Sequence, residues 1–98
     1  MINLKNETLD VLKENNKTIA DVLWVGSETC CLPLNSFWDM ADREYDEGYG
    51  GPEVNMNLLV VGSDWWLERH EYDGSEWWEF KTLPKMPNKV GLEVPIFV

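Results

Sequence analysis

The sequence predicts a single α+β domain: two short helices and an antiparallel-rich sheet of four or five strands, in the order α-β-α-β-β-β, with a last β if the fifth strand forms. Three observations favour this fold class. Two segments carry apolar residues at helical spacing, and others are rich in β-branched and aromatic residues. A dense aromatic and acidic stretch, residues 64–82, is divided by an Asp73–Gly74 turn and has the pattern of a β-hairpin. The 98 residues, with six Trp, suit one modest core.

The first helix is expected over residues 6–16. Asn6 can cap its amino end, where the backbone N–H groups lack partners within the helix. Leu9 and Leu12 share one face at the i, i+3 spacing, which gives the helix an apolar side to bury.

A largely buried strand is expected over residues 19–25, since β-branched and aromatic side chains dominate there and Gly26 follows. Residues 27–34 predict a loop. The adjacent Cys30 and Cys31 match neither a disulfide framework nor a zinc spacing, and we expect them to be small half-buried residues.

The second helix is expected over residues 36–46. Ser36, with Asp39 three residues later, resembles a capping box. The apolar face comprises Phe37, Met40 and Ala41, with Trp38 and Tyr45 at its margin. Three carboxylates at the i, i+3 and i+7 positions should line the opposite face: Asp39, Asp42 and Asp46. Gly48 should end this helix, and residues 49–52 predict a glycine-rich connection.

Residues 54–61 predict a strand that enters the centre of the sheet, because apolar residues first alternate and then occupy both faces. Residues 62–64 should turn the chain into the hairpin. Beyond it, residues 83–88 form a proline-broken connection with two lysines. Residues 91–98 predict a last strand, which Pro95 restricts to a sheet edge.

Two registers are open to the hairpin. A two-residue loop would place two pairs of carboxylates directly opposite each other, Glu71 with Glu76 and Glu68 with Glu79. Directly opposed like charges are unfavourable. We therefore expect a three-residue loop over residues 73–75, with Gly74 left-handed, which pairs Arg69 with Glu79 and His70 with Trp78.

The expected register assigns the hairpin side chains to two faces. The expected core face carries Trp66, His70, Tyr72, Trp78 and Phe80, with Glu68 intruding. The other face carries Trp65, Leu67, Arg69, Glu71, Trp77, Glu79 and Lys81. This second face would be acidic and would expose two tryptophans as a binding anchor, Trp65 and Trp77. The alternative is that one ring of each Trp-Trp pair fills the core and its neighbour covers a helix or an apolar edge.

Charge is concentrated in one part of the chain. Residues 35–80 hold twelve acidic side chains against two basic ones, Arg43 and Arg69, which accounts for the whole net charge of −10. Such a surface repels nucleic acid and anionic lipid and attracts basic partners. The alternative is a solvated acidic face that serves solubility alone.

Metal, cofactor and enzyme chemistry are not expected. Four carboxylates follow a calcium-loop spacing, Asp42, Glu44, Asp46 and Glu53, but Glu47 stands where the sharp turn needs glycine. The single histidine, His70, excludes a two-histidine site; it could act as a base beside Glu68 or Tyr72, but a histidine on a hairpin is more often a packed or surface residue. No phosphate loop, dinucleotide fingerprint or nucleophile elbow is present. The sequence therefore favours a binding protein over an enzyme.

The second half of the chain contains the stretches YDEGYGG (45–51), DWWLER (64–69) and EYDGSEWWEF (71–80). These stretches resemble small proteins encoded by phages and prophages of Gram-positive bacteria. The resemblance implies a viral accessory gene whose product acts in the bacterial host, and small acidic phage proteins include inhibitors of host defence, anti-CRISPR proteins among them. It assigns no site residue. The absence of a signal-peptide pattern and of a long apolar run agrees with a cytoplasmic setting.

These observations lead to a hypothesis of a non-enzymatic inhibitor that binds a basic, nucleic-acid-handling host protein, for example a CRISPR effector. Carboxylates would stand where phosphates bind: Asp39, Asp42, Asp46, Glu71, Asp73, Glu76 and Glu79, with Trp65 or Trp77 as an anchor. One alternative is an oligomeric sponge that holds a nucleotide signal between aromatic rings, although Arg43 and Arg69 are few cations for its phosphates. Another is a structural or regulatory phage protein.

Overall fold

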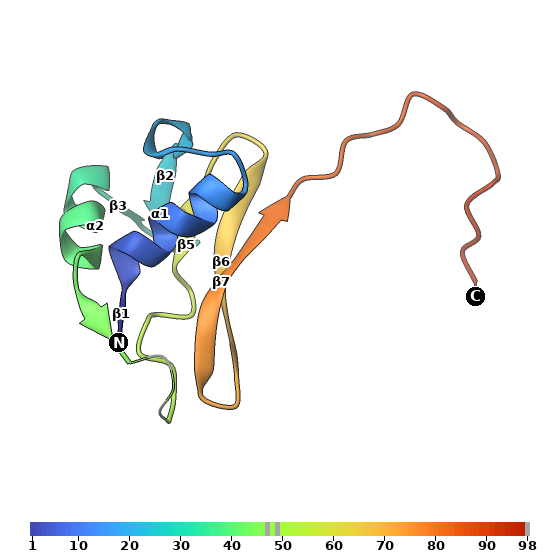
Figure 1. The fold of residues 1–98 in the computed structure, drawn as a ribbon. Helices are drawn as coiled ribbons and strands as arrows, with labels where there is room; N and C mark the ends of the chain where they lie inside the picture. Colours follow the sequence, from blue (N-terminus) through green and yellow to red (C-terminus); the bar gives the residue numbers. More distant parts are fainter. Residues whose placement is uncertain (47, 49, 98) are drawn as a thin grey trace.

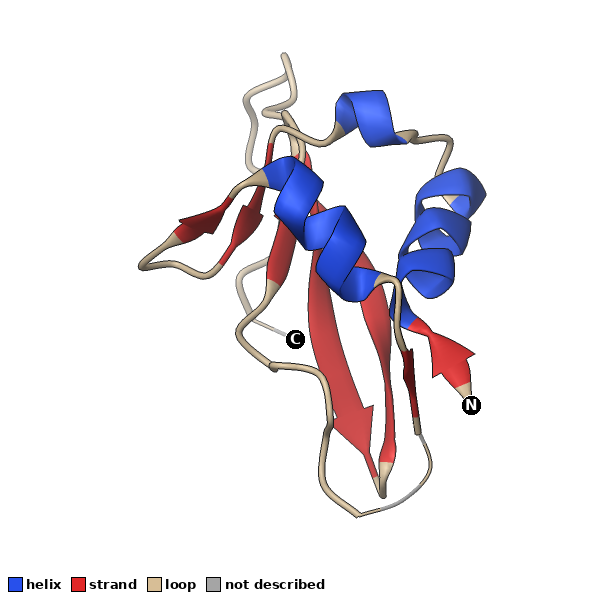
Figure 2. Cartoon of the chain, turned by 90° about the vertical axis from the view of Figure 1, so that its left-hand side faces the viewer, coloured by secondary structure: helices blue, strands red, loops and turns tan. Residues whose placement is uncertain are grey.

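A computed structural model describes residues 1–46, 48 and 50–97. Its main sheet is antiparallel, with the strand order β3-β2-β5-β6-β7. These strands are β2 (Trp24–Gly26), β3 (Cys31–Leu32), β5 (Leu59–Val61), β6 (Trp65–Tyr72) and β7 (Ser75–Thr82). A second, two-stranded sheet pairs β1 (Ile2–Asn3) with β4 (Glu44–Tyr45). Two α-helices, α1 (Leu4–Glu14) and α2 (Leu34–Ala41), gather on one side of the main sheet (Figures 1 and 2). The α+β prediction is confirmed.

The first helix starts earlier than predicted because Asn3, not Asn6, caps it. The Asn3 side chain accepts a hydrogen bond from the Asn6 backbone N–H at 3.0 Å. The predicted apolar face is confirmed: Leu12 is fully buried, and Leu9 packs against the core from a half-buried position.

The second helix is shorter than predicted: it begins two residues earlier, at Leu34, and ends five residues earlier, at Ala41. It follows Pro33, whose φ of −59° suits a helix start, and Ser36 lies inside it rather than at its cap. It ends at Ala41, because the chain then enters β4. The predicted face of Asp39, Asp42 and Asp46 is therefore wrong: only the first belongs to α2. Met40, predicted to be apolar core, is 62% exposed, and Trp38 is buried in its place.

Local turns shorten two predicted strands. Residues 19–21 form a 3-10 helix, η1 (Ile19–Asp21), because the Thr18 backbone N–H donates to the Asp21 carboxylate at 2.8 Å. The Asn57 backbone N–H donates to the Asn55 side chain, so the strand predicted over residues 54–61 begins only at Leu59. The predicted loop over residues 27–34 contains β3 and the start of α2. Cys30 and Cys31 are exposed, not half-buried.

The hairpin has the two-residue turn that the sequence argument rejected. Asp73 has φ 51° and Gly74 has φ 86°, the left-handed pair that two-residue hairpin loops favour. Cross-strand partners are Glu68 with Glu79, Arg69 with Trp78, His70 with Trp77, and Glu71 with Glu76. The opposed carboxylates are tolerated because other side chains engage them: His70 lies within 3.4 Å of both Glu68 and Glu79, and the Arg69 guanidinium binds Glu76.

The register difference reverses the two faces of β6, since side chains alternate along a strand. The core below the helices contains Trp65, Leu67 and Trp78 from the hairpin, together with Val25 and Val60. Four helix residues and Val22 complete it; the helix residues are Leu12, Phe37, Trp38 and Ala41. The predicted core positions on β6 are instead on the opposite face or exposed: Trp66, His70 and Tyr72.

Residues 83–97, which we call the arm, contain neither helix nor strand and are exposed throughout. The predicted last strand over residues 91–98 is not formed up to residue 97. The arm extends away from the body (Figure 1), and the radius of gyration is 16.3 Å, compared with about 13 Å for a compact domain of this length. Three residues of earlier predictions lie outside the described residues: Glu47, Tyr49 and Val98. No helix in the described part is long and apolar enough to cross a membrane.

Gly62→Ala should destabilise the fold by about 1–3 kcal/mol, because a Cβ at this position overlaps the buried indole of Trp65. Urea unfolding followed by tryptophan fluorescence measures the change. Gly51→Ala is the matched control, since a Cβ there has no atom within 4 Å, and it should change stability by less than about 0.5 kcal/mol. Equal stability of the two variants would show that Trp65 does not pack against Gly62.

Candidate protein-interaction surface

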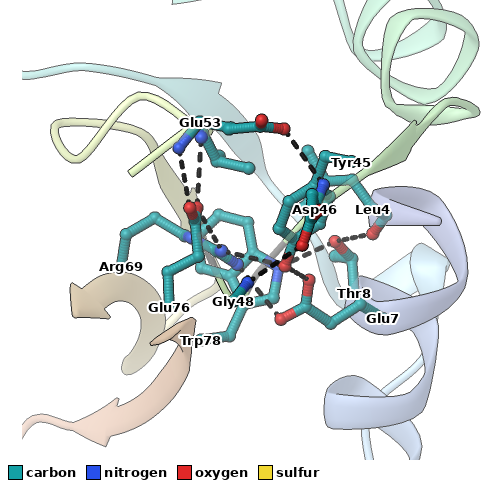
Figure 3. Close-up of polar contacts among 11 residues, drawn as sticks. Leu4, Glu7, Thr8, Tyr45, Asp46, Gly48, Glu53, Arg69, Glu76 and Trp78 are labelled. Carbon is teal, nitrogen blue, oxygen red and sulfur yellow. Dashed lines mark hydrogen bonds and ion pairs between the residues drawn. The ribbon is translucent and has the colours of Figure 1, made fainter. Parts of the chain in front are cut away.

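A buried guanidinium joins three parts of the fold. Arg69 on β6 is 4% exposed. One terminal nitrogen donates to Glu7 on α1 at 3.2 Å, and the other donates to Glu76 on β7 at 2.9 Å. The second nitrogen also donates to the Tyr45 hydroxyl at 3.1 Å, and that hydroxyl donates to Glu7. Figure 3 shows these side chains converging between the helix and the hairpin.

Aromatic rings enclose the charge. The guanidinium carbon lies 4.8 Å from the Trp78 ring centroid and 5.7 Å from that of Tyr45, both within the range of cation–π attraction. The Trp78 indole N–H donates to Thr8 at 2.9 Å, and the Thr8 hydroxyl donates to the Leu4 carbonyl, which fixes the ring against α1. Among the described residues, Arg69 Nε is the buried side-chain nitrogen without a partner.

The surroundings keep Arg69 charged. Burial alone lowers the pKa of the guanidinium, but the hydrogen bond to Tyr45 and the charge of Glu7 outweigh it, so that the pKa is raised. Burial, reinforced by the hydrogen bond to Glu7, raises the pKa of Tyr45, which stays neutral. The positive charge of Arg69 is thus neutralised inside the molecule by two carboxylates, Glu7 and Glu76.

Glu76 also fixes the loop between β4 and β5. Its carboxylate accepts hydrogen bonds from the backbone N–H groups of Glu53, at 2.7 Å, and Val54, at 3.1 Å. The Glu53 carboxylate in turn accepts from the Asp46 N–H at 3.0 Å (Figure 3). At the hairpin turn, a Cβ at Gly74 would be in ordinary contact with the loop carbonyls of residues 48 and 50, 3.6 Å from each. The loop therefore lies against the hairpin turn.

Acidic residues lie at the start of β4, on this loop and at the hairpin turn, and the loop and the turn lie side by side at the lower end of the body in Figure 1. We call this region the acidic end, and it comprises Asp42, Glu44, Asp46, Glu53, Glu71 and Asp73. All are exposed except Asp46, which is half-buried. Of the two arginines in residues 35–80, only Arg43 is exposed. The segment thus presents its negative charge with one exposed arginine to oppose it.

The structure brings together four of the predicted site residues and separates the rest. Asp42, Asp46, Glu71 and Asp73 belong to the acidic end. Two predictions are wrong: Glu76 is 1% exposed and bound to Arg69, and Trp65 is 2% exposed within the core. Asp39 is exposed on α2, away from the hairpin. The sequence argument also missed Glu7 and Tyr45 as partners of Arg69. The parity of a two-residue Asp-Gly turn, which puts Arg69 and Glu76 on one face, could have indicated this pairing.

The sheet face opposite the helices carries a polar ladder between two half-buried indoles, Trp66 and Trp77. The Trp66 N–H donates to Glu68 at 2.7 Å, and the Trp77 N–H donates to Glu79 at 3.2 Å. His70 Nε2 lies 2.6 Å from the Glu68 carboxylate, and its Nδ1 lies 3.4 Å from that of Glu79. The Lys81 ammonium lies 3.1 Å from Glu79. Trp77 was predicted to share an exposed face of the sheet with Trp65. It shares the face opposite the helices with Trp66 instead.

Hydrogen bonds to the ladder carboxylates favour their charged forms. The bond from Trp66, followed by that from His70, lowers the pKa of Glu68. The bond from Lys81, followed by that from Trp77, lowers the pKa of Glu79. The described residues contain no group of three or more His, Cys, Asp or Glu that could hold a metal ion.

Comparisons with protein-family models, curated proteins and solved structures find no match to this chain. The resemblance to phage proteins therefore remains a prediction.

Arg69→Met should destabilise the protein by about 3–5 kcal/mol, because buried Glu76 and half-buried Glu7 would be left without their cation. Chemical denaturation at neutral pH measures the loss. Arg43→Met removes the same charge from an exposed position and should cost less than about 0.5 kcal/mol. A similar cost for both variants would contradict the structural role of Arg69.

Glu68→Gln should flatten the acid side of the stability profile. The folded pKa of Glu68 lies below its usual 4.5, so its contribution is present above that value and disappears as the pH falls through the folded pKa. Thermal unfolding from about pH 6 to about pH 3 should therefore show wild type and variant converging at the acid end. Glu71→Gln, an exposed change on the same strand outside the ladder, is the control. If the difference in unfolding temperature between wild type and Glu68→Gln stayed constant with pH, the charged form of Glu68 would not be stabilised by the ladder contacts.

Proposed function

We propose that this protein is a non-enzymatic inhibitor that binds a basic, nucleic-acid-handling protein through its acidic end. The observation that carries the proposal is the distribution of charge around Arg69. This arginine is buried against Glu7 and Glu76, so it does not neutralise the carboxylates exposed nearby. An uncompensated, ordered acidic surface attracts basic partners and repels nucleic acid.

The acidic end is held in place by backbone hydrogen bonds, which supports recognition rather than simple solubility. Glu76 fixes the loop through two backbone N–H groups, and Glu53 fixes it again through Asp46. The Asp73–Gly74 turn has the tight geometry of a two-residue hairpin loop. A surface ordered before binding loses less conformational entropy when a partner binds. Its carboxylates would meet the Lys and Arg side chains that otherwise contact phosphates.

The biological setting follows the phage resemblance and is part of the proposal. A viral protein of this kind would act in the cytoplasm of a bacterial host, and a CRISPR effector is the example of a target that we favour. The nucleotide-sponge alternative loses support, because Arg69 is buried and Arg43 is the exposed arginine of the acidic segment. No observation favours a structural or regulatory phage role.

A triple variant of the acidic end should lose target binding: Asp46→Asn, Glu71→Gln and Asp73→Asn. Asparagine at position 73 keeps the left-handed turn. Removing three charge contacts, two of them exposed and one half-buried, should weaken binding by about 1.5 kcal/mol, or roughly tenfold. The matched control removes three exposed charges elsewhere: Asp10→Asn, Glu14→Gln and Glu28→Gln. Because both triples change the net charge equally, the difference between them isolates the acidic end.

The measurement is capture of proteins from a bacterial lysate on the immobilised chain at low and high ionic strength, with the two triples beside it. A true target should be retained at low salt, lost at high salt and displaced by duplex nucleic acid. Capture that survives in the acidic-end triple, or a target that binds duplex and this chain together, would refute phosphate mimicry.

A further inference from the structure

The sheet ends in a long free edge. β7 is eight residues long and pairs only with β6 among the described residues. The Leu83 N–H donates to the Asp64 carbonyl at 2.8 Å, which sets the alternation of bonded and non-bonded pairs along the hairpin. The backbone groups that point away from β6 therefore belong to Glu76, Trp78, Phe80 and Thr82. An edge of this length is a template for another strand.

The arm has the pattern of a strand that lacks a sheet. Its apolar residues alternate, and each is at least 80% exposed: Val90, Leu92, Val94 and Ile96. The residues between them are small, charged or proline: Gly91, Glu93 and Pro95. A period of two places all four apolar side chains on one side of an extended segment.

One pairing satisfies both the backbone and the side chains. If the apolar residues of the arm point their backbone groups at β7, they pair with residues such as Trp78 and Phe80 and share their face of the sheet. That face is the one the helices cover, and Phe80 lies half-buried at its margin. Pro95 has the opposite parity, so its missing N–H falls on the outer edge, where it removes no bond and blocks a further strand.

The arm is directed away from its own β7. Pro84 and Pro87 lack N–H groups and fix φ near −65°, which keeps the connection extended. Every described residue from 83 onward is exposed, and Figure 1 shows the arm leaving the body. Charge favours contact between the arm and an acidic body, its own or that of another copy. Residues 83–98 carry two lysines against one glutamate, whereas residues 1–82 carry six basic and seventeen acidic side chains.

We propose that two copies of the chain form a dimer by exchanging arms. Residues 90–96 of each copy pair antiparallel with β7 of the other, and their apolar side chains extend the core beside Phe80. The exchange lets each β7 edge gain a strand and buries side chains that otherwise face water. This dimerisation is independent of the acidic end and adds a second interaction surface to the molecule.

Proline substitutions of opposite parity test the pairing. Leu92→Pro removes an N–H that the dimer uses and should weaken dimerisation by about tenfold or more. Gly91→Pro removes an N–H that faces outward and should leave the dimer intact. Sedimentation equilibrium over a range of concentrations gives the mass of each chain, compared with 11.4 kDa for one copy. The arm does not pack on the body, so circular dichroism should show the same fold in both variants.

Three results would overturn the proposal. The first is a full chain that remains a monomer at every concentration. The second is a dimer that persists unchanged in Leu92→Pro or in a chain ending at Asn88, because it would not depend on the arm. The third is a monomer whose arm amides are protected from hydrogen exchange, which would show that the arm folds back on its own β7.

Discussion

The ion pairs of Arg69 with Glu7 and Glu76 determine how the rest of the chain is arranged. A buried charge is costly unless partners surround it, and these partners come from α1 and β7, with Tyr45 of β4 adding a hydrogen bond. A one-residue slip of the hairpin would turn Arg69 to the opposite face and leave both carboxylates without a cation. Helix packing, hairpin register and the position of β4 are therefore coupled through one side chain.

The same interaction explains the surface. Arg69 occupies one oxygen of Glu76, while that carboxylate also accepts the N–H groups of Glu53 and Val54. The acidic loop is thus fixed against the hairpin by Glu76, a residue that is itself buried. The cation that could have neutralised the acidic end serves the interior instead. The same burial of Arg69 stabilises the interior and leaves the acidic end negatively charged, which is compatible with a binding role for that end.

Local patterns in the sequence were sufficient for the fold class, the α1 face, the hairpin position and the concentration of acidic residues. They failed where a distant contact decides the outcome. The two-residue strands β1 and β4 have no period to detect, and their pairing ends α2 before Asp42 and Asp46. The register prediction failed because opposed carboxylates were judged as isolated pairs. Once the contacts of His70 with Glu68 and Glu79 and the ion pair of Arg69 with Glu76 are counted, the Asp73–Gly74 turn preference prevails, and Trp65 and Glu76 move from the surface to the interior.

Hydrogen exchange at the Glu53 and Val54 backbone amides tests most directly whether buried Glu76 holds the acidic loop. Both amides lie in a loop without regular structure, yet both donate to a carboxylate that is 1% exposed. They should be protected to nearly the same extent as the amides that form the backbone hydrogen bonds between β6 and β7. If the Glu53 and Val54 amides exchanged at the rate of an open loop while the β6–β7 backbone amides stayed protected, Glu76 would not fix the acidic end.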